Sequence, residues 1–327
     1  MTLGVTAAVC TRNRPGQLRR ALRSLVAQEL VPGEILVVDN SPADDATRRL
    51  VASEFPRIRY VREPVPGLDV ARNRALTAAT MDIVAFLDDD AVADPYWIAT
   101  LSSAFADNPD AAACTGRVDP LALDTEAQRL FEANGGMTGS QVTRRLRLPR
   151  DAGLLMGGRP APRVAWALTA GCGCNLAVHR QRALALGGFD EALGAGSMAP
   201  GGEEGDLLWR MLAAGLPVIC EPGARVAHEH RETMDALAHQ LAGYQAGIVA
   251  LLTKTLGRTR GQERLGVFAF LVWRLAKPLV RLLRRTMGRD PLPASMLLRM
   301  WWSGWCGLRA YRTGVRVAAN RRRTPPT

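Results

Sequence analysis

Four short apolar segments in the first third of the chain constrain the fold more than any other feature. They are rich in β-branched residues and cover Val5–Val9, Glu34–Val38, Ile58–Val61 and Ile83–Leu87. Segments with apolar residues at helical spacing lie between the first three. Continuous apolar strands that alternate with amphipathic helices are typical of a mostly parallel sheet covered by helices on both faces. We therefore predict an α/β fold.

Polar side chains directly follow these predicted strands. Thr11 and Arg12 follow the first strand, Asp39 follows the second, and the run Asp88–Asp90 follows the fourth. Ligands of such sheets bind outside the carboxyl ends of the strands, so we expect these side chains to share one crevice. A single acid at such a position often only caps a helix or shapes a turn, but a cap needs one acid and not three.

Three consecutive aspartates also raise an electrostatic question. Each ionised carboxylate makes ionisation of its neighbours more costly, so Asp88–Asp90 predict a positive partner. A second acidic group opens a predicted helix from Glu203 to Gly215, which has apolar residues on one face. Acids are favoured in the first turn of a helix by its dipole, so a purely structural role for Glu203 and Glu204 stays open.

A set of motifs recurs in a definite order along the chain. They read AAVCTRNRP, ILVVDNSP, GLDVARNRAL, VAFLDDD, GGFDEALGAG, GGEEGDLLWR and VAHEHR. The ordered set resembles family 2 glycosyltransferases of the GT-A fold, over roughly residues 4 to 250. The resemblance implies an enzyme that uses a nucleotide-diphosphate sugar, whose two phosphates are bridged by Mg²⁺ or Mn²⁺. Hard divalent cations of this kind take oxygen ligands and keep water and phosphate in their shells.

The resemblance also implies roles for the acids at the end of the fourth strand. Asp90 corresponds to the direct metal ligand, and Asp88 to the acid that contacts the ribose or the metal shell. Asp89 is expected to face away. His228 of VAHEHR corresponds to the histidine that completes the metal or diphosphate site, although a histidine after a strand is commonly only a hydrogen-bonded structural residue.

The nucleotide would be bound by further residues of these motifs. By resemblance, Thr11 and Arg12 border the base, Asp39 accepts a hydrogen bond from a base N–H, and Arg72 and Asn73 line the nucleotide pocket. For Arg72 the alternative is an ordinary surface ion pair.

The reaction requires a base that takes the proton of an acceptor hydroxyl while the diphosphate leaves. In this family the second acid of a Gly-Glu-Asp motif has that role, and here Glu204 stands in its place, with Glu203 as the alternative. A single displacement inverts the anomeric centre. The Gln-x-x-Arg-Trp motif of processive members is absent from the sequence, so we predict transfer of one hexosyl or related sugar to a discrete acceptor.

The sequence also bears on two other classes of function, a non-catalytic binding protein and an oxidoreductase. A catalytically inactive homologue that binds sugar nucleotides and serves as a scaffold or regulator stays open, because Glu204 departs from the family pattern. A dinucleotide oxidoreductase is disfavoured, since no Gly-x-Gly-x-x-Gly follows the first strand.

Charge divides the chain into two parts. The 327 residues carry a net charge of +11, yet residues 1–253 sum to −4 and residues 254–327 to +15. We expect a catalytic domain over 1–253, with a nucleotide-binding half at 1–111 and an acceptor-side half at 112–253. Residues 254–327 would form a basic, Trp-rich helical tail.

The tail alternates basic residues with long aliphatic ones, which a nucleic-acid arm would not need. Arg274, Lys277 and Arg281 beside Phe268 and Leu271 predict an amphipathic helix at an anionic membrane surface. The tail would bring the site close to a lipid-linked or cell-envelope glycan acceptor. The alternative is that its tryptophans pack against the catalytic domain.

Location and redox state follow from two further observations. The N-terminus shows no secretory signal, so we expect a cytoplasmic protein, peripheral at the cytoplasmic face of the membrane. The six cysteines show no paired metal-ligand spacing, and we expect reduced thiols. The donor nucleotide is expected to be UDP, the commonest in the family.

Overall fold

The four predicted strands form the parallel half of a nine-stranded sheet, in the order β3-β2-β1-β4. In the computed structural model, which describes residues 4–137 and 144–323, they are β1 (Val5–Thr11), β2 (Glu34–Asn40), β3 (Arg59–Glu63) and β4 (Ile83–Asp88). Each strand extends one or two residues further than its apolar run. The polar residues predicted to follow the strands are therefore in part their last residues.

The second half of the sheet is mixed. β8 (Asn175–His179) pairs antiparallel with β4, and β6 (Ala113–Pro120) pairs antiparallel with β8. β9 (Val218–His228) runs parallel to β6, and it pairs antiparallel with β5 (Ala91–Ala93) and β7 (Leu146–Leu148). The sheet thus joins a parallel half to a half with reversed strands.

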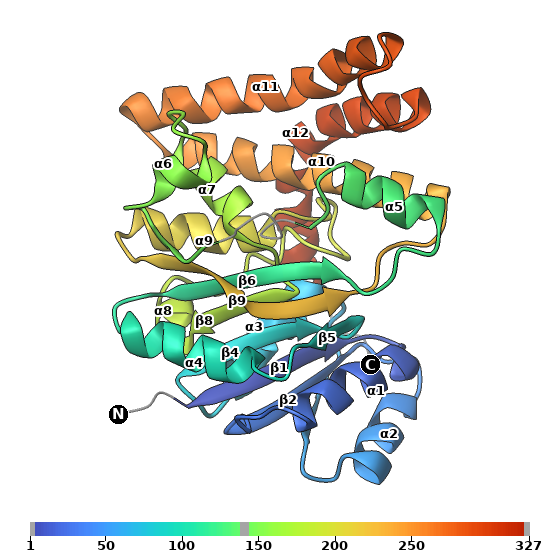
Figure 1. Cartoon of the computed structure of the whole chain (residues 1–327), viewed down its shortest axis with the longest axis vertical. Coiled ribbons are helices and arrows are strands. Elements are labelled where there is room, and N and C mark those ends of the chain that lie inside the picture. The colour runs from blue at the N-terminus through green and yellow to red at the C-terminus, as the bar shows by residue number, and fades with distance from the viewer. Residues whose placement is uncertain (1–3, 138–143, 324–327) are drawn as a thin grey trace.

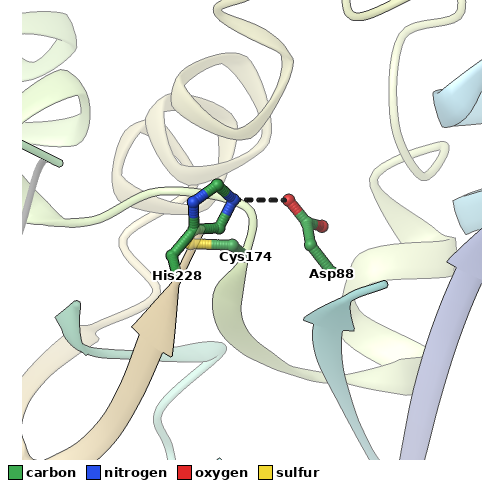
Figure 2. A group of neighbouring side chains, drawn as sticks. All are labelled: Asp88, Cys174 and His228. Atoms are coloured by element: carbon green, nitrogen blue, oxygen red, sulfur yellow. Dashed lines mark ion pairs between the residues drawn. The ribbon is translucent and has the colours of Figure 1, made fainter. Parts of the chain in front are cut away.

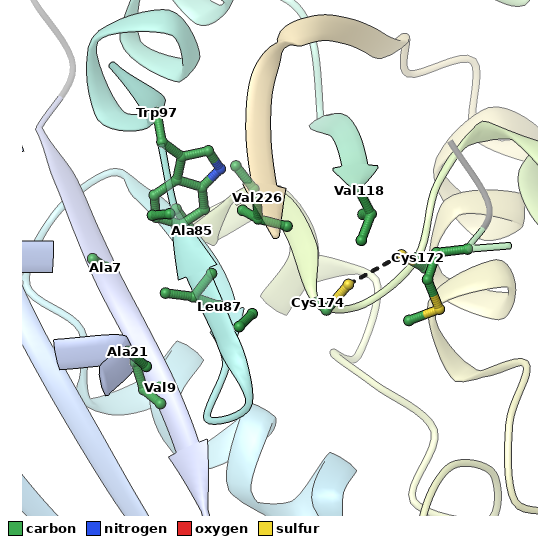
Figure 3. Close-up of a cluster of buried hydrophobic side chains, with 14 of the residues drawn as sticks. Ala7, Val9, Ala21, Ala85, Leu87, Trp97, Val118, Cys172, Cys174 and Val226 are labelled. Atoms are coloured by element: carbon green, nitrogen blue, oxygen red, sulfur yellow. Dashed lines mark hydrogen bonds between the residues drawn. The ribbon is translucent and has the colours of Figure 1, made fainter. Parts of the chain in front are cut away.

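Alternation along β4 shows that helices cover both faces of the sheet, as predicted. Ile83, Ala85 and Leu87 pack in one core with α1 (Pro15–Val26) and α4 (Trp97–Asp107), part of which Figure 3 shows. Val84 and Phe86 point to the other side, into a core with α3 (Leu68–Ala78) and α9 (Glu203–Ala213). Successive strand residues face opposite sides, so an unbroken apolar run requires two covered faces.

The predicted helix at Glu203 is confirmed as α9, and its leucines are buried. The remaining helices are α2 (Ala46–Glu54), α5 (Glu126–Ala133), α6 (Ala152–Leu155), α7 (Arg163–Ala170), α8 (Arg180–Ala185), α10 (Met234–Arg258), α11 (Gly261–Thr286) and α12 (Ala294–Arg323). In Figure 1, α10 and α11 lie together at one end of the molecule, and α12 runs from that end back toward the sheet.

The basic tail is packed on the rest of the chain. α10 continues without a break across residue 253, where the sequence suggested a boundary. Lys254 Nζ lies 2.6 Å from Asp190 Oδ2, and Tyr311 Oη donates to the same oxygen at 3.0 Å. Near the end of α12, Arg321 donates to the carbonyls of Pro66 and Gly196. The alternative considered above, that the tryptophans of the tail pack against the catalytic domain, is wrong for Trp273, Trp302 and Trp305, which are exposed.

The expected ranges, 1–253 for the catalytic domain and 254–327 for the tail, are described except at three short segments. Residues 1–3, 138–143 and 324–327 of those ranges lie outside the described part of the chain. Within the described part, no helix combines the length and the apolar character needed to cross a membrane.

Candidate active site

A cavity of about 870 Å³ opens at the carboxyl ends of β1 and β4. Thr11, Arg12 and Asp88 line it on the side of the parallel strands, and Glu204 lines it at the start of α9. The first three turns of α10 close the far side with His239, Gln240, Tyr244 and neighbouring residues. The crevice expected from the strand ends is therefore present, and it has walls from both halves of the sheet.

Strand pairing brings His228 to the acidic end of β4. The chain turns through Asp89 and Asp90 into β5, where Ala91 pairs directly with His228 of β9. His228 Nε2 lies 3.1 Å from Asp90 Oδ1 and 4.0 Å from Asp88 Oδ2, the latter marked in Figure 2. The predicted grouping of Asp88, Asp90 and His228 in one place is thus observed.

Burial and mutual attraction have opposite effects on the pKa values of Asp90 and His228. Burial by itself would raise the pKa of Asp90, but the hydrogen bond and the charge of His228, with help from Arg14, lower that pKa to about 2. Burial by itself would lower the pKa of His228, but the hydrogen bond to Asp90 and the nearby carboxylates raise it. The two shifts favour an ionised Asp90 beside a protonated His228.

Asp89 bonds to β1 instead of to His228. It accepts a hydrogen bond from Thr11 Oγ1 at 2.7 Å, and Arg14 Nη1 lies 3.3 Å from both Asp89 and Asp90. Burial, partly offset by the Thr11 hydroxyl, raises the pKa of Asp89 to about 6. The Thr11 hydroxyl, predicted to border the base, is thus engaged by Asp89, and the Arg12 side chain is left exposed at the cavity wall.

Arg72 joins the two acidic groups of the site. Its guanidinium on α3 is buried, with Nη1 3.0 Å from Glu203 Oε1 and 3.5 Å from Asp69 Oδ1, and Nη2 3.6 Å from Asp88 Oδ1. The surface ion pair considered for this residue is therefore wrong. Burial, reinforced by the charge of Glu203, raises the pKa of Asp69 well above its usual range.

The start of α9 presents the two candidate bases differently. Gly202 caps the helix with a φ of 84°, a left-handed conformation that suits glycine, and Glu203 then turns onto Arg72. Glu204 faces the cavity, and its Oε2 has no hydrogen-bond partner among the described residues. Burial and the charge of Glu203 raise the pKa of Glu204 to about 8, and the charge of Arg72 only partly offsets them.

Two predicted nucleotide contacts do not line the cavity that the described residues form. Asp39 is fully buried and accepts a hydrogen bond from the Tyr60 hydroxyl at 2.8 Å. Asn73 uses its amide to hold the loop after α8, bonding the backbone of Phe189 and the carboxylate of Glu191. The Asn73 side chain is therefore engaged by the segment around Phe189, and neither Phe189 nor Glu191 lines this cavity.

Other residues of the site were missed in the sequence. Arg14 and Asp69 lie in the motifs CTRNRP and GLDVARN, and the spacing of Asp69 and Arg72, three residues apart on a helix, signals their contact. Cys174 gave no such signal, because it reaches the site only through the pairing of β8 with β4.

The donor atoms suit a divalent cation. One ligand atom each of Asp88, Cys174 and His228 lies within 4.8 Å of the others, and Asp90 adjoins His228. His228 Nδ1 is buried without a hydrogen-bond partner in the described part of the chain. Carboxylate and imidazole ligands together accommodate Mn²⁺ well, and carboxylates alone suffice for Mg²⁺.

A known structure shares this fold. Over 99% of the chain the fold superposes on a mannosyltransferase from Pyrobaculum calidifontis, solved with GDP-Man and Mn²⁺, with a TM-score of 0.58, 18% identity and 89% of that chain covered. The fold is therefore of the GT-A type.

In sequence, the profile of the family described as "Glycosyl transferase family 2" matches residues 6–159. The succinoglycan biosynthesis protein ExoM of Rhizobium meliloti is 31% identical over 248 residues, which are 72% of this chain and 70% of that protein. The pre-mycofactocin glycosyltransferase of Mycobacterium tuberculosis is 30% identical over 69% of this chain, and the match spans only 43% of that protein. The chain belongs to glycosyl transferase family 2.

Replacing Arg72 by Met should destabilise the fold. Three carboxylates would lose their buried cation, which for a buried ion pair costs about 3–5 kcal/mol of unfolding free energy. The deficit should shrink as pH falls and those carboxylates take up protons. Urea unfolding between pH 5 and 8 measures both effects.

The matched control is Arg59→Met, which removes a half-exposed arginine that pairs with Glu34 at 2.9 Å. It should cost less than about 1 kcal/mol. Equal costs for the two variants would show that the buried cluster around Arg72 does not stabilise the fold.

Proposed function

We propose that this chain transfers one hexosyl or related sugar from a nucleotide-diphosphate sugar to an acceptor hydroxyl, with inversion. The observation that carries the proposal is one cavity with Asp88, Asp90 and His228 on one wall and Glu204 on another. Arg72 bonds to both acidic groups and so fixes their relative position. The donor would be UDP-linked, with the GDP sugar of the solved neighbour as the first comparison.

The donor phosphates would lie against the end of β4. Asp88, Asp90 and His228 would hold Mg²⁺ or Mn²⁺ there, and when bound the ion neutralises the charge of the diphosphate. Arg12 borders the cavity close to the end of β1, where the base would lie, with Thr11 held by Asp89 behind it. Asp39 would act on the base only through its free Oδ1, since Tyr60 occupies the other oxygen.

Glu204 would take the proton of the acceptor hydroxyl at its Oε2, which faces the cavity without a partner in the described structure. A base with a pKa near the working pH transfers protons most effectively, and burial has brought Glu204 into that range. Glu203 is held by Arg72, so we assign it to positioning the start of α9. Because Arg72 engages Glu203, we propose Glu204 as the base.

The acceptor would enter beside α10. The names of the two relatives, one for succinoglycan biosynthesis and one for pre-mycofactocin, support acceptors that range from envelope glycans to small molecules. We favour a cell-envelope or lipid-linked glycan because α11, which packs on α10, carries an exposed apolar stripe suited to a membrane surface.

Activity should rise with pH through an apparent pKa of about 8, because Glu204 must lose its proton before it can act as a base. Glu204→Gln should lower kcat by about 10²–10⁴ and abolish this limb of the profile. The measurement is nucleotide release from UDP- and GDP-sugars between pH 6 and 9.5.

Glu203→Gln is the matched control, one residue away, and it should keep the pH limb but move it to lower pH, because the charge of Glu203 no longer raises the pKa of Glu204. If the limb disappears in Glu203→Gln and persists in Glu204→Gln, the two roles are exchanged. Equal nucleotide release by wild type, Glu204→Gln and Asp90→Ala would favour the inactive sugar-nucleotide-binding homologue.

We also propose that residues 254–327 hold the catalytic part, residues 1–253, at the cytoplasmic face of a membrane. α11 carries an exposed apolar stripe along its whole length, at spacings of three, four and seven residues. The stripe consists of Leu265, Phe268, Val272, Leu279, Leu283 and Met287. Between residues 264 and 289 the sequence contains no acid, and Arg264, Arg284, Arg285 and Arg289 are exposed. An apolar stripe with basic ends complements an anionic lipid surface.

This stripe differs from the face that the sequence suggested. Leu271 turns inward, Arg274 bonds to Gln245, and Arg281 bonds to Asp290 and Asn134. Helical spacing alone could not separate the two faces, because α11 is apolar on both: one packs on α10 and α12, and the other is exposed.

Phe268→Asp combined with Val272→Asp should weaken binding to vesicles that contain anionic lipid by about tenfold or more, since burying one such side chain contributes about 1.5–3 kcal/mol. Vesicle co-sedimentation of the full chain measures it. Val26→Asp with Val31→Asp changes two valines of the catalytic part that are at least as exposed as Val272, and it should leave binding intact. Equal binding by both double variants, or no binding by wild type, would contradict the proposal.

A further inference from the structure

We propose that the thiolate of Cys174 is a ligand of the divalent ion at the end of β4, which makes the site prefer Co²⁺ or Zn²⁺ to Mg²⁺. This inference rests on the proposed function, because it concerns the same ion. It adds a ligand that neither the motifs nor the family resemblance assigns.

Strand register places Cys174 at the metal site. β8 pairs antiparallel with β4, and Asn175, its first residue, lies opposite Leu87. Cys174 therefore reaches the end of β4 where Asp88 lies. Figure 2 shows the Cys174 side chain beside the imidazole of His228, with Asp88 across from it. The sulfur, an imidazole nitrogen and a carboxylate oxygen all lie within 4.8 Å of one another.

The position of Cys174 is fixed on both sides. Asn175 is fully buried: its amide donates to the carbonyls of Arg117 and Ala224 and accepts from the Trp97 indole at 2.9 Å. On the other side, a Cβ at Gly173 would lie 2.3 Å from Arg72 Nη2, so the backbone there packs directly on the buried guanidinium. A side chain held this firmly is pre-organised to bind an ion.

The chemistry of the donor set determines which ion it prefers. Thiolate is a soft ligand that favours Zn²⁺ and the later divalent metals, whereas Mg²⁺ demands oxygen ligands in a near-octahedral shell. One sulfur and one nitrogen among the nearest donors therefore penalise Mg²⁺. When the ion binds, the thiol proton is released to solvent.

The alternative is a purely structural role, with Cys174 as a small apolar core residue. It is 2% exposed, its sulfur lies 3.3 Å from that of Cys172, and Figure 3 shows both at the margin of the core around Val118 and Val226. Cys172 is buried in the same way but is not part of the group that could hold an ion. The two cysteines thus form a matched pair for an experiment.

The experiment is a Co²⁺ titration of the full chain, followed by absorption spectroscopy, without nucleotide and with a phosphine reductant. Wild type should show visible ligand-field bands together with a near-ultraviolet sulfur-to-cobalt charge-transfer band. Cys174→Ser should lose the charge-transfer band, keep the ligand-field bands and bind Co²⁺ about tenfold or more weakly, with little change for Mg²⁺. Cys172→Ser and the exposed Cys306→Ser should retain the charge-transfer band.

The outcomes separate this inference from the proposed function. Ligand-field bands without charge transfer in wild type, or a charge-transfer band that survives Cys174→Ser, would overturn the role of Cys174 and leave the metal site standing. No Co²⁺ binding by wild type would remove both. If Cys174→Ser does not fold, a wild-type spectrum without the charge-transfer band still overturns the inference, and a band retained in both Cys172→Ser and Cys306→Ser supports it.

Discussion

Concentrated negative charge inside the cavity is the constraint on which the rest of the structure depends. Five carboxylates line it, those of Asp88, Asp89, Asp90, Glu203 and Glu204, and Asp69 is buried behind them. Arg14, Arg72 and His228 form ion pairs with members of this group. Burying unbalanced charge is costly, so several of these acids have raised pKa values. A divalent cation would remove much of the remaining excess. The excess of negative charge in the cavity therefore favours binding of an ion and, through it, of a diphosphate.

Local patterns predicted the parallel half of this protein and the start of α9. Apolar runs fixed β1 to β4 to within two residues at their carboxyl ends, because both faces of those strands are covered. The clusters of Asp88, Asp90, His228 and Glu204 were predicted through family motifs, and the structure brings them to one cavity. The charged tail was also identified, since its composition differs from that of the body.

What the sequence did not predict depends on contacts between distant segments. Cys174 reaches the site only because β8 pairs antiparallel with β4, and no local pattern determines such a register. Asn73 and Asp39 have the right residue types at the right strand and helix ends, yet both are held by neighbours that are 116 and 21 positions away. The inner and outer faces of α11 are similarly apolar, so only the packing against α10 and α12 distinguishes them.

The central claim is that a divalent ion held at the end of β4 is what binds the nucleoside diphosphate. The most direct test is calorimetric titration of the wild-type chain with UDP and with GDP, once in saturating Mn²⁺ and once in excess EDTA. The account predicts that the preferred nucleotide binds at least about tenfold more tightly with the ion. Equal affinity in EDTA would contradict it, because the carboxylates of β4 would then face the phosphates without a cation between them.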